Sequence, residues 1–405
     1  MKILQLCKKF PFPLKDGESI AVTYMSKALK ELGCELTLLA MNTVKHFYEI
    51  DQLPSSFNHY EAIHTIPIDN RVKVKDAFLN LFSDESYHIT RFVSEAYKTK
   101  LIELLKKNQY DVIQLETLYL APYITTIRAH STAVIAMRSH NVEHEIWERI
   151  TQNTRFPIKK YYLNHLTQKL KSFEINHLNK YDIMVSITQR DLDYFSKLGF
   201  TKKGIVAPIG LEMTNYTPEY DSFSQPLSLS FIGSLDWMPN LEGLEWFIKH
   251  VIPSIKKKYP TVKLHIAGRN MPKHLLNYKD SHIVVHGEVE SSTAFLNEHS
   301  VMIVPLFSGS GMRAKILEAM SLGKVVLTTP LGLEGIHATD QDEILLAQTE
   351  NAFMNQLGFC IKEKQNLIKM GKKARTFIEE NYDYKAVTKR LLAFYEEIVY
   401  KTIKK

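Results

Sequence analysis

Short runs of apolar, mostly β-branched residues alternate with amphipathic helical stretches along most of the chain. The first repeat predicts a strand at 2–6, a helix at 19–32 with its apolar residues on one face, and a second strand at 35–40. Gly33 directly follows the expected helix, at the position where a glycine commonly ends a helix. Because strands that alternate with helices build βαβ units, the pattern predicts parallel sheets of the α/β class.

The alternation stops once, at 207–226, where three prolines and no sustained periodicity predict a linker. It then resumes, so we expect two doubly wound, Rossmann-like domains at 1–206 and 227–382. The last stretch, 383–405, reads as one amphipathic helix, which we expect to pack back on the first domain. Further strands are expected at 111–115, 132–137 and 182–187, then at 227–232, 262–267, 282–285, 301–305, 324–327 and 343–346, with long helices at 89–107 and 158–180. The length of 405 residues agrees with two domains, because single cores rarely serve chains beyond about 250–300 residues.

The composition excludes several classes of protein. Hydrophobic residues make up 45% of the chain and charged residues 23%, which is typical of a folded chain and not of a disordered one. No apolar run approaches the roughly 18–20 residues of a membrane span. Lys8 and Lys9 follow the first apolar stretch, which favours a strand there over a signal peptide. We therefore expect a cytoplasmic protein.

Cysteine content and net charge narrow the chemistry further. Cys7, Cys34 and Cys360 form no CxxC motif or Cys/His cluster, so neither a disulfide framework nor a zinc site is expected. The net charge of +7 is compatible with an anionic membrane surface or a phosphorylated substrate. The sequence carries no nucleic-acid-binding motif, so nucleic acid is not an expected partner.

The strongest chemical pattern is the stretch 304–335, which reads as strand, glycine-containing loop, helix and strand. Gly309 and Gly311 allow the backbone to approach a ligand closely. The helix expected at about 312–322 would direct its free N–H groups and positive dipole end at a diphosphate, with Arg313 and Lys315 adding charge. Glu318 follows two turns into this helix, where its carboxylate could accept hydrogen bonds from a ribose diol. A tight turn followed by a solvated, charged helix is the alternative interpretation.

The segment 318–326 reads Glu-Ala-Met-Ser-Leu-Gly-Lys-Val-Val, which resembles family four of the retaining glycosyltransferases, also called group 1. The resemblance implies the GT-B fold, in which two Rossmann-like domains face each other across a cleft that holds the active site. That family carries two glutamates separated by seven residues, of which the first lies near the donor sugar and the second binds the nucleotide ribose. Glu318 matches the second glutamate, whereas Ser310 stands at the position of the first. The Ser310 hydroxyl and the adjacent amides would then contact the sugar or a phosphate oxygen.

Two segments of the first half also resemble the family. Residues 11–17, ending in Gly17, are similar to its first glycine loop, near donor and acceptor. Residues 138–143 follow an expected strand and resemble its histidine-bearing segment, which implies that His140 faces the donor sugar. A purely structural histidine is the alternative, although its place at the carboxyl end of a strand in a doubly wound sheet favours a functional role.

The second half departs from the family at one loop. Residues 231–240 resemble the entry of the second domain, but they lack the phosphate-binding Arg and Lys that the family places there. Arg269 and Lys315 are the expected substitutes, because charge on the leaving diphosphate must be stabilised; a surface salt bridge is the alternative role for Arg269. Residues 287–289 follow the next strand, where the family binds the base through main-chain groups.

These patterns define the candidate site. The expected catalytic residues are His140, Lys315 and Arg269. The expected donor-binding residues are Gly17, Gly233, Ser308, Gly309, Ser310, Gly311, Met312, Arg313, Glu318 and Val289, and the expected acceptor-side residues are Glu116, Arg138 and Asn141. Neither a cofactor nor a metal is expected, because the Asp-x-Asp pair Asp191 and Asp193 lies in a helical run where such carboxylates diverge.

The sequence therefore predicts transfer of a sugar from a nucleoside diphosphate sugar to a glycan or lipid-linked acceptor, with retention of anomeric configuration as the resemblance implies. Two alternatives stay open. One is a nucleotide-sugar epimerase on the same fold, with Glu116 and Glu143 as its acid and base. The other is a catalytically silent nucleotide-binding assembly subunit, which Ser310 and the missing Arg/Lys pair favour.

The stretch 158–180 adds a possible membrane contact. It carries five lysines against one acidic residue, Glu174, with aromatic and aliphatic side chains between them. A basic helix with an apolar face can lie on anionic lipid at the inner face of the cell membrane. A helix that packs on the core and exposes its charged back is the alternative.

Overall fold

The computed structural model describes residues 1–309 and 311–403. Contacts among the described residues divide the chain into two compact units. Unit 1 comprises Met1–Gly210 together with the segment that begins at Tyr384, and unit 2 comprises Leu211–Asp383.

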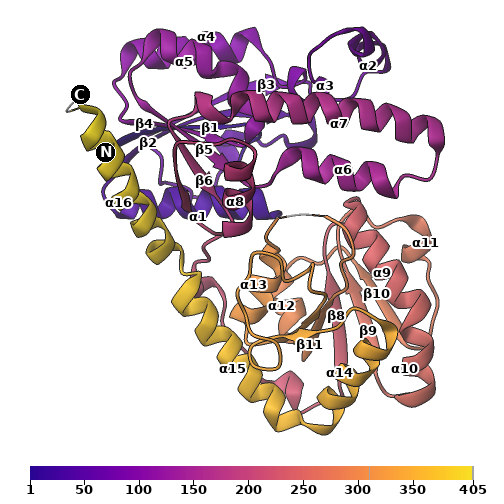
Figure 1. The fold of residues 1–405 in the computed structure, drawn as a ribbon. Coiled ribbons are helices and arrows are strands. Elements are labelled where there is room, and N and C mark those ends of the chain that lie inside the picture. The colour runs from indigo at the N-terminus through magenta and orange to yellow at the C-terminus, as the bar shows by residue number, and fades with distance from the viewer. Residues whose placement is uncertain (310, 404–405) are drawn as a thin grey trace. The chain divides into compact units, whose positions relative to one another are not determined.

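Unit 1 is built on a seven-stranded parallel sheet in the order β3-β2-β1-β4-β5-β6-β7 (Figure 1). Its strands are β1 Lys2–Cys7, β2 Glu35–Thr43, β3 Ala62–Ile68, β4 Val112–Glu116, β5 Val134–Ser139, β6 Ile183–Ser186 and β7 Lys203–Val206. Its helices are α1 Gly17–Glu31, α2 Val74–Leu79, α3 Tyr87–Thr90, α4 Glu95–Lys107, α5 Ile124–His130, α6 Glu143–Asn153, α7 Pro157–His177, α8 Gln189–Lys197 and α16 Tyr384–Ile403. Short 3-10 turns are η1 Val44–His46, η2 Ile50–Gln52, η3 Asn80–Phe82, η4 Leu118–Tyr123 and η5 Leu178–Lys180.

The side chains of β1 alternate between two cores, one on each face of this sheet. Leu4 and Leu6 belong to the core that α4, α5, α7 and α8 complete, whereas Ile3 and Cys7 belong to the core beneath α1 and α16. Helix α16 packs directly against α1, and its buried Tyr395 reaches Gln114 of β4 with a hydrogen bond of 2.7 Å. Because both faces are covered, the central strands are apolar almost throughout, as parallel sheets require.

Unit 2 holds a six-stranded parallel sheet in the order β10-β9-β8-β11-β12-β13 (Figure 1). Its strands are β8 Ser228–Ile232, β9 Lys263–Ala267, β10 Ile283–Gly287, β11 Val301–Val304, β12 Val325–Thr328 and β13 Leu345–Leu346. Its helices are α9 Met238–His250, α10 Ile252–Lys258, α11 Lys273–Leu276, α12 Ser292–Asn297, α13 Ala314–Ser321, α14 Glu350–Lys362 and α15 Lys364–Asn381, with 3-10 turns η6 Met213–Asn215 and η7 Asp221–Phe223. Alternate residues of β8 and β9 enter a core that α9, α10, α14 and α15 cover.

The prediction of an α/β fold with two doubly wound parallel sheets is confirmed. Three helices differ from the sequence expectation. The stretch 89–107 forms two helices: α3 ends at Thr90, and Ser94 caps the start of α4 by accepting a hydrogen bond from the Tyr97 amide. The stretch 158–180 ends its α-helix at His177 and continues as η5. Helix α13 begins at Ala314, later than the expected Met312, because its N-cap residue Arg313 has extended backbone with φ of −94° and ψ of 90°. Among the described helices, none is both long enough and apolar enough to cross a membrane.

Candidate functional site

The strand order of unit 2 identifies where a ligand should bind. The chain proceeds outward from β8 through β9 to β10 on one side, and from β11 through β12 to β13 on the other. Doubly wound sheets bind ligands outside the carboxyl ends of the strands at such a reversal. Gly233 directly follows β8, and Ser308 and Gly309 follow β11. The fold therefore places the expected donor-binding loop at the reversal point.

The loop between β11 and α13 has the backbone that its glycines suggest. Gly309 has φ of 95° and Gly311 has φ of 81°, in the left-handed region that residues with a Cβ rarely adopt. Arg313 is the N-cap residue of α13, and its side chain makes no capping hydrogen bond to the first-turn N–H groups, although the Ile316 amide donates to the Arg313 carbonyl at 2.9 Å. Ser308 donates a hydrogen bond of 2.9 Å to Glu242 of α9. Ser310 lies outside the described residues.

Lys315 is a partly buried cation in the first turn of α13. Its ammonium donates to the Asn240 side-chain oxygen at 2.8 Å and to the Ile232 carbonyl at 3.3 Å, and it lies 4.7 Å from the Phe231 ring centre. Within the described residues no ion pair involves this lysine, so its neighbours solvate the charge without neutralising it. Burial, together with the nearby Arg313 guanidinium, lowers the pKa of Lys315 to about 7. Such a group is poised to bind an anion.

The glycine directly after β8 leaves room for the Lys315 and Asn240 side chains. A Cβ on Gly233 would lie 3.2 Å from the Lys315 nitrogen and 2.9 Å from the Asn240 amide nitrogen. The lysine ammonium thus reaches the loop in which the family carries its phosphate-binding Arg and Lys. Lys315 thus brings a positively charged group from α13 to the end of β8.

Glu318 lies one turn further along α13 and is also partly buried. It accepts a hydrogen bond of 3.1 Å from the Tyr216 hydroxyl, and burial raises its pKa to about 7. No ion pair in the described part of the chain includes Glu318. A carboxylate has capacity for several hydrogen bonds, so the side chain retains acceptor capacity for a diol.

Backbone hydrogen bonds join the loops that follow β8, β9 and β10. The Leu235 amide donates to the Arg269 carbonyl at 2.9 Å, and the Gly268 amide donates to the Gly287 carbonyl at 2.7 Å. A Cβ on Gly268 would lie only 2.1 Å from the Gly233 carbonyl oxygen, so these loops pack without intervening side chains. Arg269 is partly buried in the loop after β9, and Val289 lies in the loop after β10. The expected donor residues of unit 2 thus gather along one end of its sheet.

Unit 1 has its own reversal point, between β1 and β4, and its buried charges cluster there. Glu116 ends β4 and is fully buried; it receives hydrogen bonds from Gln5 at 2.6 Å and from Gln114, and it pairs with Arg138 at 3.4 Å. Burial alone would raise the pKa of Glu116, but Arg138, His140 and Gln5 hold it at about 2. The carboxylate is therefore ionised at neutral pH.

This carboxylate fixes the state of His140. The Nε2 atom of His140 lies 2.7 Å from Glu116 Oε2 and must donate, because an ionised carboxylate only accepts. When the ring is neutral, its other nitrogen, Nδ1, is therefore an acceptor. Glu116 and Arg138 are both 0% exposed, whereas the His140 side chain is 7% exposed. This burial favours a positioning role, through His140, for the two residues expected on the acceptor side.

The remaining expected residues lie beside this cluster. Gly17 begins α1, immediately after Asp16, which caps the helix and pairs with Lys9 at 2.7 Å. The Asn141 carbonyl accepts a hydrogen bond of 2.7 Å from Ser139. Glu143, the other carboxylate of the epimerase alternative, is buried; burial raises its pKa to about 7, and the Tyr119 hydroxyl donates to it at 3.0 Å.

Tyr216 and Asn240, the partners of Glu318 and Lys315, were missed by the sequence reasoning. Asn240 stands in the segment 231–240 whose resemblance to the family was noted, so its position was a signal. Tyr216 lies 102 residues before Glu318, in a stretch without periodicity, and no local pattern identifies it.

Comparison with known proteins covers this site. Residues 226–363, which include Lys315 and Glu318, match the family model described as Glycosyl transferases group 1. An uncharacterised 44.6 kDa protein in the cps region of Klebsiella pneumoniae is 24% identical over 398 residues, covering 95% of this chain and 97% of that protein. An uncharacterised glycosyltransferase of Methanocaldococcus jannaschii is 22% identical over 358 residues, covering 84% and 83%.

Solved structures extend the likeness of fold to the whole chain. Sucrose-phosphate synthase from Thermosynechococcus elongatus has a TM-score of 0.75 at 14% identity, covering 98% of this chain and 99% of that one. The Anabaena protein HepE, solved in complex with UDP, has a TM-score of 0.68 at 12% identity, covering 98% and 100%. The candidate donor site thus lies in a segment that matches the group 1 glycosyltransferase family, and the fold along the whole chain is similar to that of these solved structures.

Proposed function

We propose that this protein is a glycosyltransferase that moves a sugar from a nucleoside diphosphate sugar to a glycan or lipid-linked acceptor, with retention at the anomeric carbon. The observation that carries the proposal is the pair Lys315 and Glu318 on α13. The cation and the carboxylate are both partly buried and have pKa values near 7 because of that burial. A diphosphate would neutralise the first, and a ribose diol would satisfy the second.

The leaving diphosphate then explains the arrangement at the β8–β11 reversal. Negative charge develops on the diphosphate as the glycosidic bond breaks, and groups already oriented toward it lower the barrier. Lys315 and the N-terminal amides of α13 would supply that stabilisation, with Arg269 as a further cation. Since the phosphate dianion favours the ammonium form, donor binding should raise the pKa of Lys315 above its ligand-free value.

His140 would act on the sugar side. Its Nε2–H is committed to Glu116, which leaves Nδ1 and the backbone of 138–141 for the donor or acceptor. The fixed ring supports a positioning function, because a side chain locked by a charged hydrogen bond loses little entropy on binding. No residue is assigned as a covalent nucleophile; in the proposed front-face reaction the diphosphate itself helps to deprotonate the acceptor.

Relatives guide the choice of donor and acceptor. HepE has been solved with UDP and with UDP-glucose, which supports uridine as the first base to test here. The Klebsiella relative is described as a protein of the cps region, which supports a cell-surface polysaccharide intermediate as the acceptor class.

Helix α7 supports peripheral contact with anionic lipid, through its first turns only. Leu166 and Leu170 are buried, so the second half packs on the core of unit 1. Lys171 pairs with Glu148 at 2.9 Å, which removes it from the expected basic face. At the start of the helix, Phe156, Ile158 and Tyr161 are 75%, 87% and 80% exposed, beside the exposed Lys159 and Lys160. We propose this turn as the membrane contact. Reversing the charge of both lysines should abolish cosedimentation with anionic vesicles at low salt, and absence of wild-type binding would leave a soluble acceptor as the better proposal.

A thermal-shift panel of nucleotide sugars tests the donor, because a ligand that binds the folded state raises its apparent stability. The best donor is then incubated with and without candidate acceptors, and the anomeric configuration of the product is read by NMR. A retained configuration in an acceptor-dependent product is expected. Conversion of the donor sugar without acceptor would indicate the epimerase instead, and binding with no turnover on any acceptor would indicate the silent assembly subunit.

A further inference from the structure

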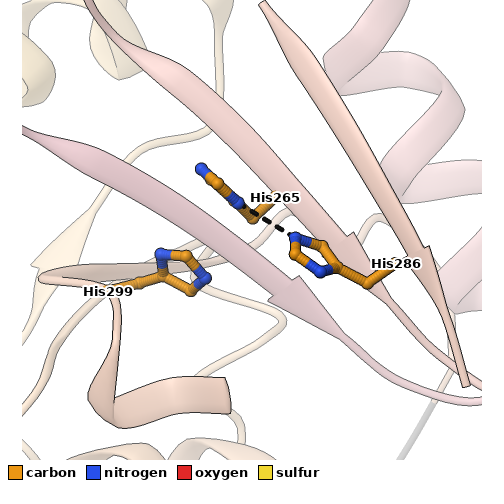
Figure 2. Close-up of side chains that lie close together, drawn as sticks. All are labelled: His265, His286 and His299. Carbon is orange, nitrogen blue, oxygen red and sulfur yellow. Dashed lines mark hydrogen bonds between the residues drawn. The ribbon is translucent and has the colours of Figure 1, made fainter. Parts of the chain in front are cut away.

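Three histidines converge on the face of the unit 2 sheet opposite its main core (Figure 2). His265 lies on β9, His286 on β10, and His299 just before β11. Leu264 and Ile266 flank His265 and enter the core, so the alternation of a strand directs His265 to the other face. One ring nitrogen of each histidine lies within 4.8 Å of those of the other two.

Separations of this size suit a shared metal ion. Imidazole nitrogens bind zinc at about 2.0–2.1 Å, which puts two ligands of a tetrahedral site about 3.3 Å apart. His265 Nδ1 and His286 Nε2 are 3.0 Å apart, near that distance, and share a hydrogen bond (Figure 2). Small rotations of side chains whose backbones are fixed by neighbouring strands would complete the geometry.

His299 provides an independent indication of a ligand. It is 4% exposed, and its Nδ1 lies 3.3 Å from the Ser228 hydroxyl. Its Nε2 is buried and has no hydrogen-bond partner among the described residues. The edge of the Phe295 ring packs against the rings of both His286 and His299, with ring centres 5.4 and 4.9 Å apart. A buried nitrogen without a partner is costly, and a metal ion at the cluster would satisfy it.

The donor atoms of the cluster indicate which class of cation it would bind. Among the described residues the cluster contains no carboxylate, and a set of imidazoles favours zinc, copper or nickel over magnesium or calcium.

We propose that His265, His286 and His299 bind a divalent transition-metal ion of the zinc type, with the remaining coordination position open to solvent beside the exposed His286. The ion would join β10, the edge strand of the sheet, to β9 and to the turn before β11. Gly287 directly follows His286 and ends β10, at the start of the segment 287–289 expected to contact the nucleotide base. The metal would thus brace that loop from behind without taking part in sugar transfer.

Direct metal titration tests this site on the full chain, with any affinity tag removed and metal stripped by EDTA and dialysis. One equivalent of Co²⁺ should produce the visible absorption bands of a low-symmetry, four- or five-coordinate site, and Zn²⁺ should displace it. His286→Ala removes an exposed ligand, so the variant should fold normally by circular dichroism and bind Zn²⁺ at least tenfold more weakly. His250→Ala, which removes an exposed histidine of α9 in the same unit, is the matched control and should bind as the wild type does.

Thermal shift gives a second measurement. Zn²⁺ should raise the melting temperature of the wild type and of His250→Ala, but not of His286→Ala. Absence of one-to-one binding by the wild type would overturn the proposal. Equal Zn²⁺ affinity in the wild type, His286→Ala and His299→Gln would overturn it as well, because the ion would then be bound elsewhere.

Discussion

The two units bury charged side chains at equivalent places, the strand-order reversals of their sheets, but they treat the charges differently. In unit 1, Glu116 is surrounded by Arg138, His140 and two glutamines, and these partners hold its pKa at about 2 despite burial. In unit 2, Glu318 has a tyrosine hydroxyl and Lys315 an amide oxygen, and burial shifts the pKa of each to about 7. Glu116 is fully buried and the α13 pair only partly, yet the pKa of Glu116 is the one held low, so the counter-charges account for the difference.

The site in unit 1 is already oriented in the free protein, whereas the site in unit 2 lacks partners for its charged groups. The charges of unit 1 are neutralised inside the fold, which locks His140 in one orientation and one tautomer. The charged groups on α13 lack such compensation, which is costly in the free protein and becomes favourable only when a ligand supplies the missing charge and hydrogen bonds. The first arrangement is suited to hold a group still, and the second to bind one.

Replacing a buried glutamate by glutamine in each unit should produce the largest difference in stability between the two sites. Glu116→Gln leaves the Arg138 guanidinium buried without its counter-charge, which we expect to destabilise unit 1 by about 3–5 kcal/mol. Glu318→Gln removes a poorly compensated carboxylate, so the ligand-free protein should be as stable as the wild type or more so. Differential scanning calorimetry of both variants at pH 7.5 measures the effect. A similar loss in both would show that the two carboxylates are equally compensated.

Removing the cation of α13 should affect turnover most. Lys315→Met is expected to lower the transfer rate by about 100-fold or more, the scale of removing one preorganised group that stabilises developing charge. Its melting temperature without ligand should not fall, because a buried ammonium is replaced by an apolar chain of similar length. Arg269→Ala should also slow turnover more than it destabilises the fold. Near-normal rates in both variants would place the diphosphate elsewhere.

Glu318 should contribute to nucleotide binding on a smaller scale. Glu318→Gln is expected to weaken binding of the free nucleoside diphosphate by about 1–3 kcal/mol, as for hydrogen bonds to a charged group. Isothermal titration calorimetry gives the value, with Glu380→Gln, an exposed residue at the end of α15, as the matched control. Wild-type affinity in the Glu318 variant would contradict the ribose assignment.

The pH dependence of stability and of nucleotide affinity tests the charge states of Lys315 and Glu318. The folded-state pKa of Lys315 lies below its ordinary value, so its penalty is largest below pH 7 and disappears as pH rises from 7 toward 10.5. The folded-state pKa of Glu318 lies above its ordinary value, so it favours folding below pH 4.5 and loses that contribution as pH rises through 7. In Glu318→Gln the lysine is the member of the α13 pair that still titrates, and nucleotide affinity should fall by up to about tenfold per unit above pH 7. A flat profile there would show that the ammonium does not contact the diphosphate.

The sequence predicted the fold through its periodicity, and the α13 pattern through residues close together in the chain. Glu318 and Lys315 were identifiable because one helix carries both. Their hydrogen-bond partners were not identifiable, because Tyr216 and Asn240 come from distant segments that only the folded chain brings near α13. The cluster of three histidines was not predicted for the same reason. No two of them share a helix or strand, whereas the sequence argument against zinc relied on Cys/His spacing within short motifs. The roles of the individual site residues stay predictions until the variants are measured.

The smallest effect should come from metal removal, which separates the two sites of unit 2. Neither Lys315 nor Glu318 needs a cation to bind its ligand group, since the protein itself carries the positive charge for the diphosphate. Turnover should therefore survive EDTA, measured as initial rate at saturating donor. Protein loaded with Zn²⁺ should lose thermal stability under the same treatment, because the ion braces β9 and β10. Complete loss of activity that Mg²⁺ or Mn²⁺ restores would assign the diphosphate to a metal and not to Lys315, and it would leave the unpaired lysine without its proposed ligand.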